Sequence, residues 1–179
     1  LKDLFRPKLP SEYADTEHLI VGSKEAKYKI VVFSDPLCPF CRDFMPDIIA
    51  AALKSPRKIA LYHYSFPLLS LQPASETIVK AELVVEKKFK NKADFFKKLY
   101  SLDIQPNEPD QNKIIQTFNG QFGTKLSKQD VQSSTALKAY DAEMQRGYQM
   151  MVQGTPTVYV NGEIDDGRLK TQEILKEVQ

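Results

Sequence analysis

The two residues best suited to covalent chemistry are Cys38 and Cys41, the only cysteines in the 179-residue chain. They enclose Pro39 and Phe40 in a Cys-Pro-Phe-Cys motif. Residues three apart are neighbours on a helix, so one helical turn would bring the sulfurs close to disulfide distance. A bond that closes so short a loop would add little stability. Reversible thiol–disulfide exchange therefore explains the pair better than a structural bridge.

Metal binding is the other chemistry that a cysteine pair could serve. A zinc site needs about four ligands, and only His18 and His63, far apart in the chain, could join the cysteines. The seven glycines also never form a phosphate-binding pattern. We therefore expect neither a metal site nor any other cofactor.

A helix is predicted to begin at or just before Cys38 and to run to about residue 54. Pro39 suits its first turn, where the missing N–H costs nothing. The unpaired N–H groups and the dipole of a helix N-terminus favour a negative charge and lower a cysteine pKa. Cys38 is therefore the expected nucleophile, and Cys41, deeper in the turn, would attack the mixed disulfide that forms.

A second signal is the segment Gly154-Thr155-Pro156-Thr157. A proline directly before a strand is unusual because it donates nothing to the sheet. We expect a tight turn with a cis peptide bond between Thr155 and Pro156. Such a turn would leave nearby backbone groups free to pair with an extended substrate.

The remaining sequence predicts the elements that position these groups. Apolar, β-branched runs predict strands at 18–21, 28–33, 58–66 and 157–160, and Asn161-Gly162 predicts a hairpin to residues 163–164. Residues 70–152 have helical periodicity, and a last helix is expected at 171–178. One stripe with helical spacing is read as core packing: Leu137, Tyr140, Met144, Tyr148 and Met151. We expect an α/β fold with a lead-in (1–16), a core (17–69 and 153–179) and an inserted helical domain (70–152).

Composition excludes several classes of function. The net charge is +2 and the basic residues are dispersed, which gives no case for nucleic-acid binding. No apolar run approaches the length of a membrane span. The first residue is not Met and the opening residues do not resemble a signal peptide, so we expect that a leader was removed or trimmed.

Together these motifs resemble the DsbA-like branch of the thioredoxin superfamily, over about residues 17–178. The resemblance rests on the strand at 30–33 before the Cys-Pro-Phe-Cys motif, the segment 63–68, the helical block, and Gly154-Thr155-Pro156 with the strand that follows. It implies a thioredoxin-like fold with an inserted helical domain. It also implies that Cys38 attacks, that Cys41 resolves, and that Thr155 and Pro156 form a loop facing the pair.

The resemblance further implies a setting and partners. These are the bacterial periplasm or another oxidising compartment, unfolded or partly folded proteins that contain cysteine, and a membrane partner that reoxidises or reduces the enzyme. The expected activity is a thiol–disulfide oxidoreductase that introduces or exchanges disulfides in secreted proteins.

Three features depart from a simple oxidase. The position six residues before Cys38, often acidic in relatives, is Val32, so proton transfer at Cys41 must use water or another group. Phe40 supplies no positive charge, which predicts a less depressed Cys38 pKa and a milder oxidant. The motif and Thr155 also resemble the disulfide isomerases DsbC and DsbG. Two alternatives therefore stay open: an isomerase or reductase, and a chaperone-like binding module with an exposed apolar rim at Leu37 and Phe40.

Two more residues are candidates for tuning the site. Asp35 could adjust the reactivity of Cys38. His63 could relay protons, although a purely structural role in its strand is favoured.

Overall fold

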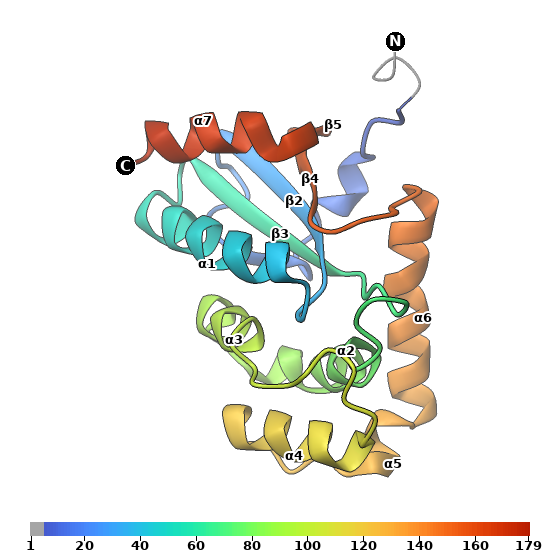
Figure 1. The fold of residues 1–179 in the computed structure, drawn as a ribbon. Coiled ribbons are helices and arrows are strands. Elements are labelled where there is room, and N and C mark those ends of the chain that lie inside the picture. Colours follow the sequence, from blue (N-terminus) through green and yellow to red (C-terminus); the bar gives the residue numbers. More distant parts are fainter. Residues whose placement is uncertain (1–5) are drawn as a thin grey trace.

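The computed structural model describes residues 6–179, so the first five residues of the expected lead-in lie outside the described part. The chain forms an α/β fold around a five-stranded sheet with the order β1-β3-β2-β4-β5. Figure 1 shows helices on the sheet and a helical block beyond one end of its strands. The strands are β1 (Leu19–Val21), β2 (Tyr28–Ser34), β3 (Ile59–Ser65), β4 (Thr157–Val160) and β5 (Glu163–Ile164).

The central strands alternate between two cores. Strand β2 pairs in parallel with β3 and antiparallel with β4. Because successive side chains point to opposite faces, Ile30 and Val32 pack with α1 (Pro39–Lys54) and α7 (Leu169–Glu177), while Val31 and Phe33 face Tyr13 and α6 (Ser134–Gln149). Both β2 and β3 are buried at their carboxyl ends, where the cysteine motif begins.

Between β3 and β4 the chain is helical, as the periodicity predicts. The helices are α2 (Ser75–Val85), η3 (Glu86–Lys88), α3 (Lys92–Leu99), α4 (Gln111–Phe122), α5 (Lys128–Val131) and α6. In Figure 1, α6 runs back from this block toward the sheet, where it contacts β3. The Asn161-Gly162 turn joins β4 to β5 in antiparallel pairing, and η4 (Asp166–Arg168) precedes α7.

The expected core stripe on α6 is only partly correct. Tyr140 and Met144 are buried, but Leu137, Tyr148 and Met151 are exposed. Helical spacing places side chains on one stripe, but it cannot tell where the partner surface ends. Met151 also lies beyond the end of α6, where its backbone φ is +55°.

The lead-in is not simply extended. Residues 11–13 form a short 3-10 helix, η2 (Ser11–Tyr13), and Tyr13 is a core residue that is 2% exposed. The Tyr13 hydroxyl donates to the carbonyl of Arg146 at 2.8 Å. The backbone N–H of Leu9 donates to the carbonyl of Gly162 at 2.8 Å. Packing against α6 and the hairpin therefore orders a segment that has no periodic signal in the sequence.

Within residues 6–179, no helix has the length and apolar character needed to cross a membrane.

Candidate active site

The cysteine motif lies where the sequence predicts, at the amino end of a helix. Cys38 is the N-cap of α1 with extended backbone angles, and Pro39 occupies the first helical position. Cys41 sits one turn further along, in the buried side of the helix. The two cysteines are free thiols in this structure.

Access to the two sulfurs differs. Cys41 is fully buried, whereas Cys38 keeps 5% of its surface exposed beside the exposed residues Pro39 and Phe40. A substrate sulfur can thus reach Cys38 only through a small opening, and it cannot reach Cys41 directly.

The segment before β4 faces the cysteine pair. The Cys38 sulfur lies 3.6 Å from the carbonyl oxygen of Thr155, to which the protonated form of Cys38 donates. The peptide bond between Thr155 and Pro156 is cis. The Thr155 side chain lowers the pKa of both cysteines, and its buried hydroxyl oxygen has no hydrogen-bond partner among the described residues.

The pair is electrostatically asymmetric. The pKa of Cys38 is lowered from 9.0 to about 5, first through the hydrogen bond from the Cys41 thiol and also through the backbone N–H groups of Cys41 and Phe40, while burial opposes the shift. Burial, and then the hydrogen bond to Cys38, raise the pKa of Cys41 far above that of an ordinary thiol. At neutral pH Cys38 is therefore the thiolate and Cys41 the thiol that donates to it.

Phe40 acts on Cys38 through its backbone. Its ring is 65% exposed and carries no charge, yet its N–H helps to lower the Cys38 pKa. That the Cys38 pKa is less depressed than in relatives with histidine at the position of Phe40 stays a prediction.

Asp35 connects the cysteine motif to the helical block. Its buried carboxylate accepts from the N–H of Leu37 at 2.9 Å, the hydroxyl of Ser75 at 2.6 Å and the N–H of Leu68 at 2.8 Å. Burial raises the Asp35 pKa, and the Cys38 charge adds to this shift in a minor way. The contacts favour a structural role: Asp35 holds the loop before α1 against the start of α2.

His63 belongs to a buried hydrogen-bonded chain that ends at Ser34. Its Nε2 lies 2.6 Å from the hydroxyl of Tyr100, which donates to Oγ of Ser34 at 2.6 Å. Ser34 lowers the pKa of Cys41, against the larger raising effect of burial. Sequence reasoning missed Ser34 and Tyr100. Ser34 could have been noticed as the polar end of a buried strand, but nothing in the sequence places Tyr100, at the end of α3, beside it.

The expected apolar rim at Leu37 and Phe40 is half correct. Phe40 is exposed, but Leu37 is only 3% exposed and packs in the core. The N–H of Leu37 is held by Asp35, which turns the chain inward at this point. The exposed Phe40 ring is thus the apolar part of the motif itself.

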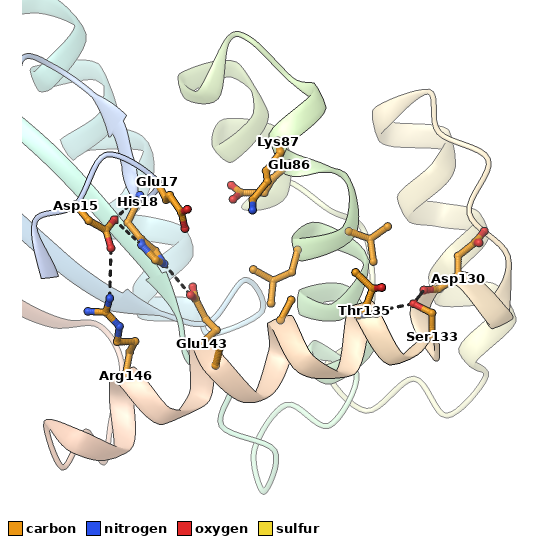
Figure 2. A pocket seen from close by; sticks show the side chains of 15 residues that line it. Asp15, Glu17, His18, Glu86, Lys87, Asp130, Ser133, Thr135, Glu143 and Arg146 are labelled. Carbon is orange, nitrogen blue, oxygen red and sulfur yellow. Dashed lines mark hydrogen bonds and ion pairs between the residues drawn. The ribbon is translucent and has the colours of Figure 1, made fainter. Parts of the chain in front are cut away.

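A sizeable cavity lies away from this site. It has a volume of about 540 Å³ and lies between the segment before β1 and helices α2 and α6, away from the cysteines. Figure 2 shows His18 on its wall between two carboxylates, Asp15 and Glu143, at 2.7 Å each. No cluster of three or more His, Cys, Asp and Glu side chains within residues 6–179 could hold a metal ion.

A strand, a cysteine pair at a helix N-terminus, a helical insertion and a proline turn facing the pair define a thioredoxin-like protein. The sequence profile of the thioredoxin family matches residues 14–179, and the chain belongs to this family. The expected α/β thioredoxin-like fold is therefore confirmed.

Solved structures show the same fold at low identity. A proposed protein-disulfide isomerase from Pseudomonas syringae has a TM-score of 0.68 and 16% identity over 92% of this chain and 99% of that one. Oxidised BdbD from Bacillus subtilis has a TM-score of 0.65 and 20% identity over 96% and 98% of the two chains. A periplasmic thioredoxin-like protein from Salmonella enterica serovar Typhimurium has a TM-score of 0.61 and 18% identity over 88% and 87%. No curated protein sequence matches the chain.

Proposed function

We propose that the protein is a thiol–disulfide oxidoreductase whose Cys38 and Cys41 exchange disulfides with cysteine-containing proteins. The observation that carries this proposal is the asymmetry of the pair: Cys38 has a pKa of about 5 and a small exposed fraction, and the fully buried Cys41 thiol donates to it. Family membership and the fold of its neighbours, among them a proposed isomerase, support the same class of activity.

The exchange is balanced in both directions. In oxidation, a substrate thiolate attacks Sγ of Cys38 in the enzyme disulfide, the bond between the cysteines breaks, and Cys41 leaves as a thiolate that is then protonated. A second substrate thiolate attacks the mixed disulfide and releases Cys38 as a thiolate. Substrate loses two electrons and the enzyme pair gains them.

The net direction of electron transfer between enzyme and substrate depends on how stable the reduced enzyme is. A low pKa makes Cys38 a good leaving thiolate and stabilises the reduced enzyme, which raises the reduction potential of its disulfide. This favours an oxidase that introduces disulfides. The alternative is an isomerase or reductase, which begins the same exchange from the dithiol form and would have a potential near that of thioredoxin.

Exposed apolar side chains support unfolded or partly folded proteins as substrates. Phe40, Leu69, Leu71 and Met151 are exposed, and they come from the motif, from the loop that follows Leu68, and from the segment before Thr155. Phe40 belongs to the cysteine motif. The loop at Leu68 is hydrogen-bonded to Asp35, just before the motif, and the Thr155 carbonyl lies within hydrogen-bond distance of Cys38. An unfolded chain exposes the apolar residues that such a surface would bind.

The proposed setting is the bacterial periplasm, with a membrane protein that reoxidises or reduces the pair. The motif resemblance supports this setting, and one structural neighbour is itself described as periplasmic.

A Cys38→Ser variant tests the enzymatic proposal. The wild-type protein, oxidised beforehand, should form disulfides in a reduced, unfolded substrate protein, and the variant should not. Ser23→Ala, a substitution remote from the cysteines, provides the control. Equal activity of Cys38→Ser and wild type would overturn the proposal in favour of the chaperone-like module. A reduction potential as low as roughly −270 mV would replace the oxidase by the reductase.

A further inference from the structure

The main chain of Asp35 contacts both cysteines. Its N–H donates to Sγ of Cys41, with 3.5 Å between nitrogen and sulfur. Its carbonyl oxygen accepts from the N–H of Cys38 at 3.1 Å. One residue in the loop before α1 is therefore hydrogen-bonded to both members of the redox pair, and a displacement of that residue changes the surroundings of both.

The N–H of Asp35 matters most when Cys41 carries a negative charge. Cys41 is fully buried, so water does not stabilise its thiolate. Burial is the main cause that raises the Cys41 pKa, and this N–H is the largest cause that lowers it. Cys41 is a thiolate at two points of the exchange: when it attacks the mixed disulfide, and when it is displaced from the enzyme disulfide. A hydrogen bond to the thiolate favours both steps.

The side chain of Asp35 fixes the loop that carries this N–H. Asp35 is completely buried, and its carboxylate accepts from the N–H of Leu37 at 2.9 Å, the hydroxyl of Ser75 at 2.6 Å and the N–H of Leu68 at 2.8 Å. The bond to Leu37, two residues further along, closes an Asx turn that bends the chain into α1. The other two bonds keep this turn from moving as a unit.

Those two bonds come from the helical insertion and from the segment that leads into it. Ser75 is the first residue of α2 and is fully buried, and Leu68 lies between β3 and α2. They are 40 and 33 positions away from Asp35 in the chain. Figure 1 shows the loop between β2 and α1 directed toward the helical block. The position of the loop beside Cys41 therefore depends on contacts that the insertion provides.

We propose that the Asp35 carboxylate positions the backbone N–H that holds the Cys41 thiolate, and that Ser75 anchors this carboxylate from α2. The role rests on the proposed function. The N–H touches the reacting sulfur, whereas the side chains of Asp35 and Ser75 act through the loop and are positioning groups. The helical insertion is thereby part of the machinery that resolves the mixed disulfide.

The step that this N–H assists is balanced. The Cys41 thiolate attacks Sγ of Cys38, and the bond from Cys38 to the substrate sulfur breaks. The substrate sulfur takes the electron pair of that bond, and in the net reaction it also takes the proton that Cys41 gave up. The substrate leaves as a thiol, and the enzyme pair is oxidised to the disulfide.

The charge of Asp35 predicts the opposite effect from its position. A carboxylate near a sulfur disfavours the thiolate, so a neutral side chain at this position would ease the ionisation of the cysteines through charge alone. The other ionisable groups near Cys41 include Cys38 on α1 and Tyr100 at the end of α3. Burial raises the pKa of Tyr100 well above its ordinary value, so Tyr100 stays neutral during the measurement. The sign of the change in rate therefore distinguishes position from charge.

Stopped-flow reaction of the reduced protein with the chromogenic disulfide dithiobis-nitrobenzoate separates the two cysteines. Attack by Cys38 releases a first coloured thiolate, and attack by Cys41 on the mixed disulfide releases a second. Asp35→Asn keeps the shape of the side chain but replaces one acceptor oxygen by a donor. We expect it to slow the second phase by roughly tenfold, the scale of one hydrogen bond to a charged group, and to shift the pH dependence of that phase upward. The first phase should stay within about twofold at neutral pH, because Cys38 is already ionised there.

Ser75→Ala is a second test variant, and Ser65→Ala is its matched control. Ser75→Ala removes one anchor and leaves the carboxylate in place, so it tests the role even where Asp35→Asn does not fold. It should slow the second phase by about threefold, the scale of one neutral hydrogen bond. Combined with Asp35→Asn it should cause little further slowing, because the two side chains act as one unit.

The control removes the same kind of bond from another place. Ser65 is fully buried and donates to the buried carboxylate of Glu82 at 2.6 Å, and Glu82 has no hydrogen bond to the cysteine motif among the described residues. Both serine variants should lose similar stability in urea, because each removes one donor to a carboxylate. Only Ser75→Ala should slow the second phase.

The outcomes separate this role from the proposed function. Release of only one thiolate by the wild-type protein would mean that Cys41 does not resolve, and both proposals would fail. Release of two thiolates, with a second phase in Asp35→Asn as fast as in the wild type or faster, would overturn the positioning role alone. Equal second-phase rates in Ser75→Ala and Ser65→Ala would overturn it as well.

Discussion

The sulfur of Cys38 lies 3.6 Å from the carbonyl oxygen of Thr155, although 117 positions separate the two residues in the chain. The sheet brings them together. Phe33 near the end of β2 pairs with Thr157 at the start of β4, so the segment before β4 must end beside the segment after β2. A substrate that approaches Cys38 therefore meets backbone from both segments at once.

The pKa of Cys38 should depend on the hydrogen-bond donor at position 41. Cys41→Ala removes the largest cause of the low Cys38 pKa, so that pKa should rise from about 5. Cys41→Ser keeps a hydroxyl donor and should raise it less. The measurement is the rate of Cys38 alkylation against pH, which in the wild type should fall as pH drops through about 5 because the thiolate is lost. Equal midpoints in all three proteins would contradict this assignment.

The contact of His18 with Asp15 and Glu143 should make stability depend on pH. Burial lowers the His18 pKa, but the hydrogen bonds and charges of Glu143 and Asp15 outweigh it and hold the pKa above 6.5. A raised folded-state pKa gives stability that is complete below the unfolded value and is lost as pH rises through the folded value.

His18→Gln should therefore lower the free energy of unfolding by at least about 1 kcal/mol near pH 5, and by clearly less near pH 9. Denaturant unfolding of wild type and variant at the two pH values measures the difference. Glu17→Gln is the control, because this neighbouring side chain is exposed. A larger loss at the higher pH would show that the charged histidine does not stabilise the fold.

Gly147 should be intolerant of a side chain. A Cβ at this position would lie 2.2 Å from a ring carbon of Phe66, a residue buried beside the loop that Asp35 holds. Gly147→Ala should cost about 1–3 kcal/mol in thermal or denaturant unfolding, as overpacking does.

Gly120 offers the opposite case. It lies inside α4, and the position that a Cβ would take has no neighbouring atom within 4 Å. Gly120→Ala should stabilise the protein by about 0.5–1 kcal/mol through helix propensity alone. If Gly120→Ala also destabilised the protein, the effect of Gly147→Ala could not be attributed to its close contact with Phe66.

Local patterns in the sequence are enough to predict much of this protein. Helix starts, buried strands and tight turns depend on neighbouring residues, so the bounds of α1, β2 and β3 and the Asn161-Gly162 hairpin could be predicted closely. The same is true of Cys38 and Cys41, because spacing along a helix fixes their distance. The proline turn was found from the residue types next to it.

Contacts between distant segments could not be predicted. The exposed ends of the α6 stripe, the buried Tyr13 and the buried Leu37 depend on where partner surfaces begin and end, which a linear pattern does not contain. The spacing of this stripe correctly predicted a helix as far as Tyr148, but Met151 lies past its end, and only Tyr140 and Met144 are buried. Burial depends on the partner surface, which the period of the sequence does not contain.

The cysteine motif, and with it the class of chemistry, was determined by the sequence alone, since three residues and one helical turn suffice to pair two sulfurs. Which of them ionises was decided by the tertiary structure. The register of β2 and β3 and the position of α3 place Ser34, Tyr100 and His63 in contact, and no local rule relates residues 34, 63 and 100 along the chain.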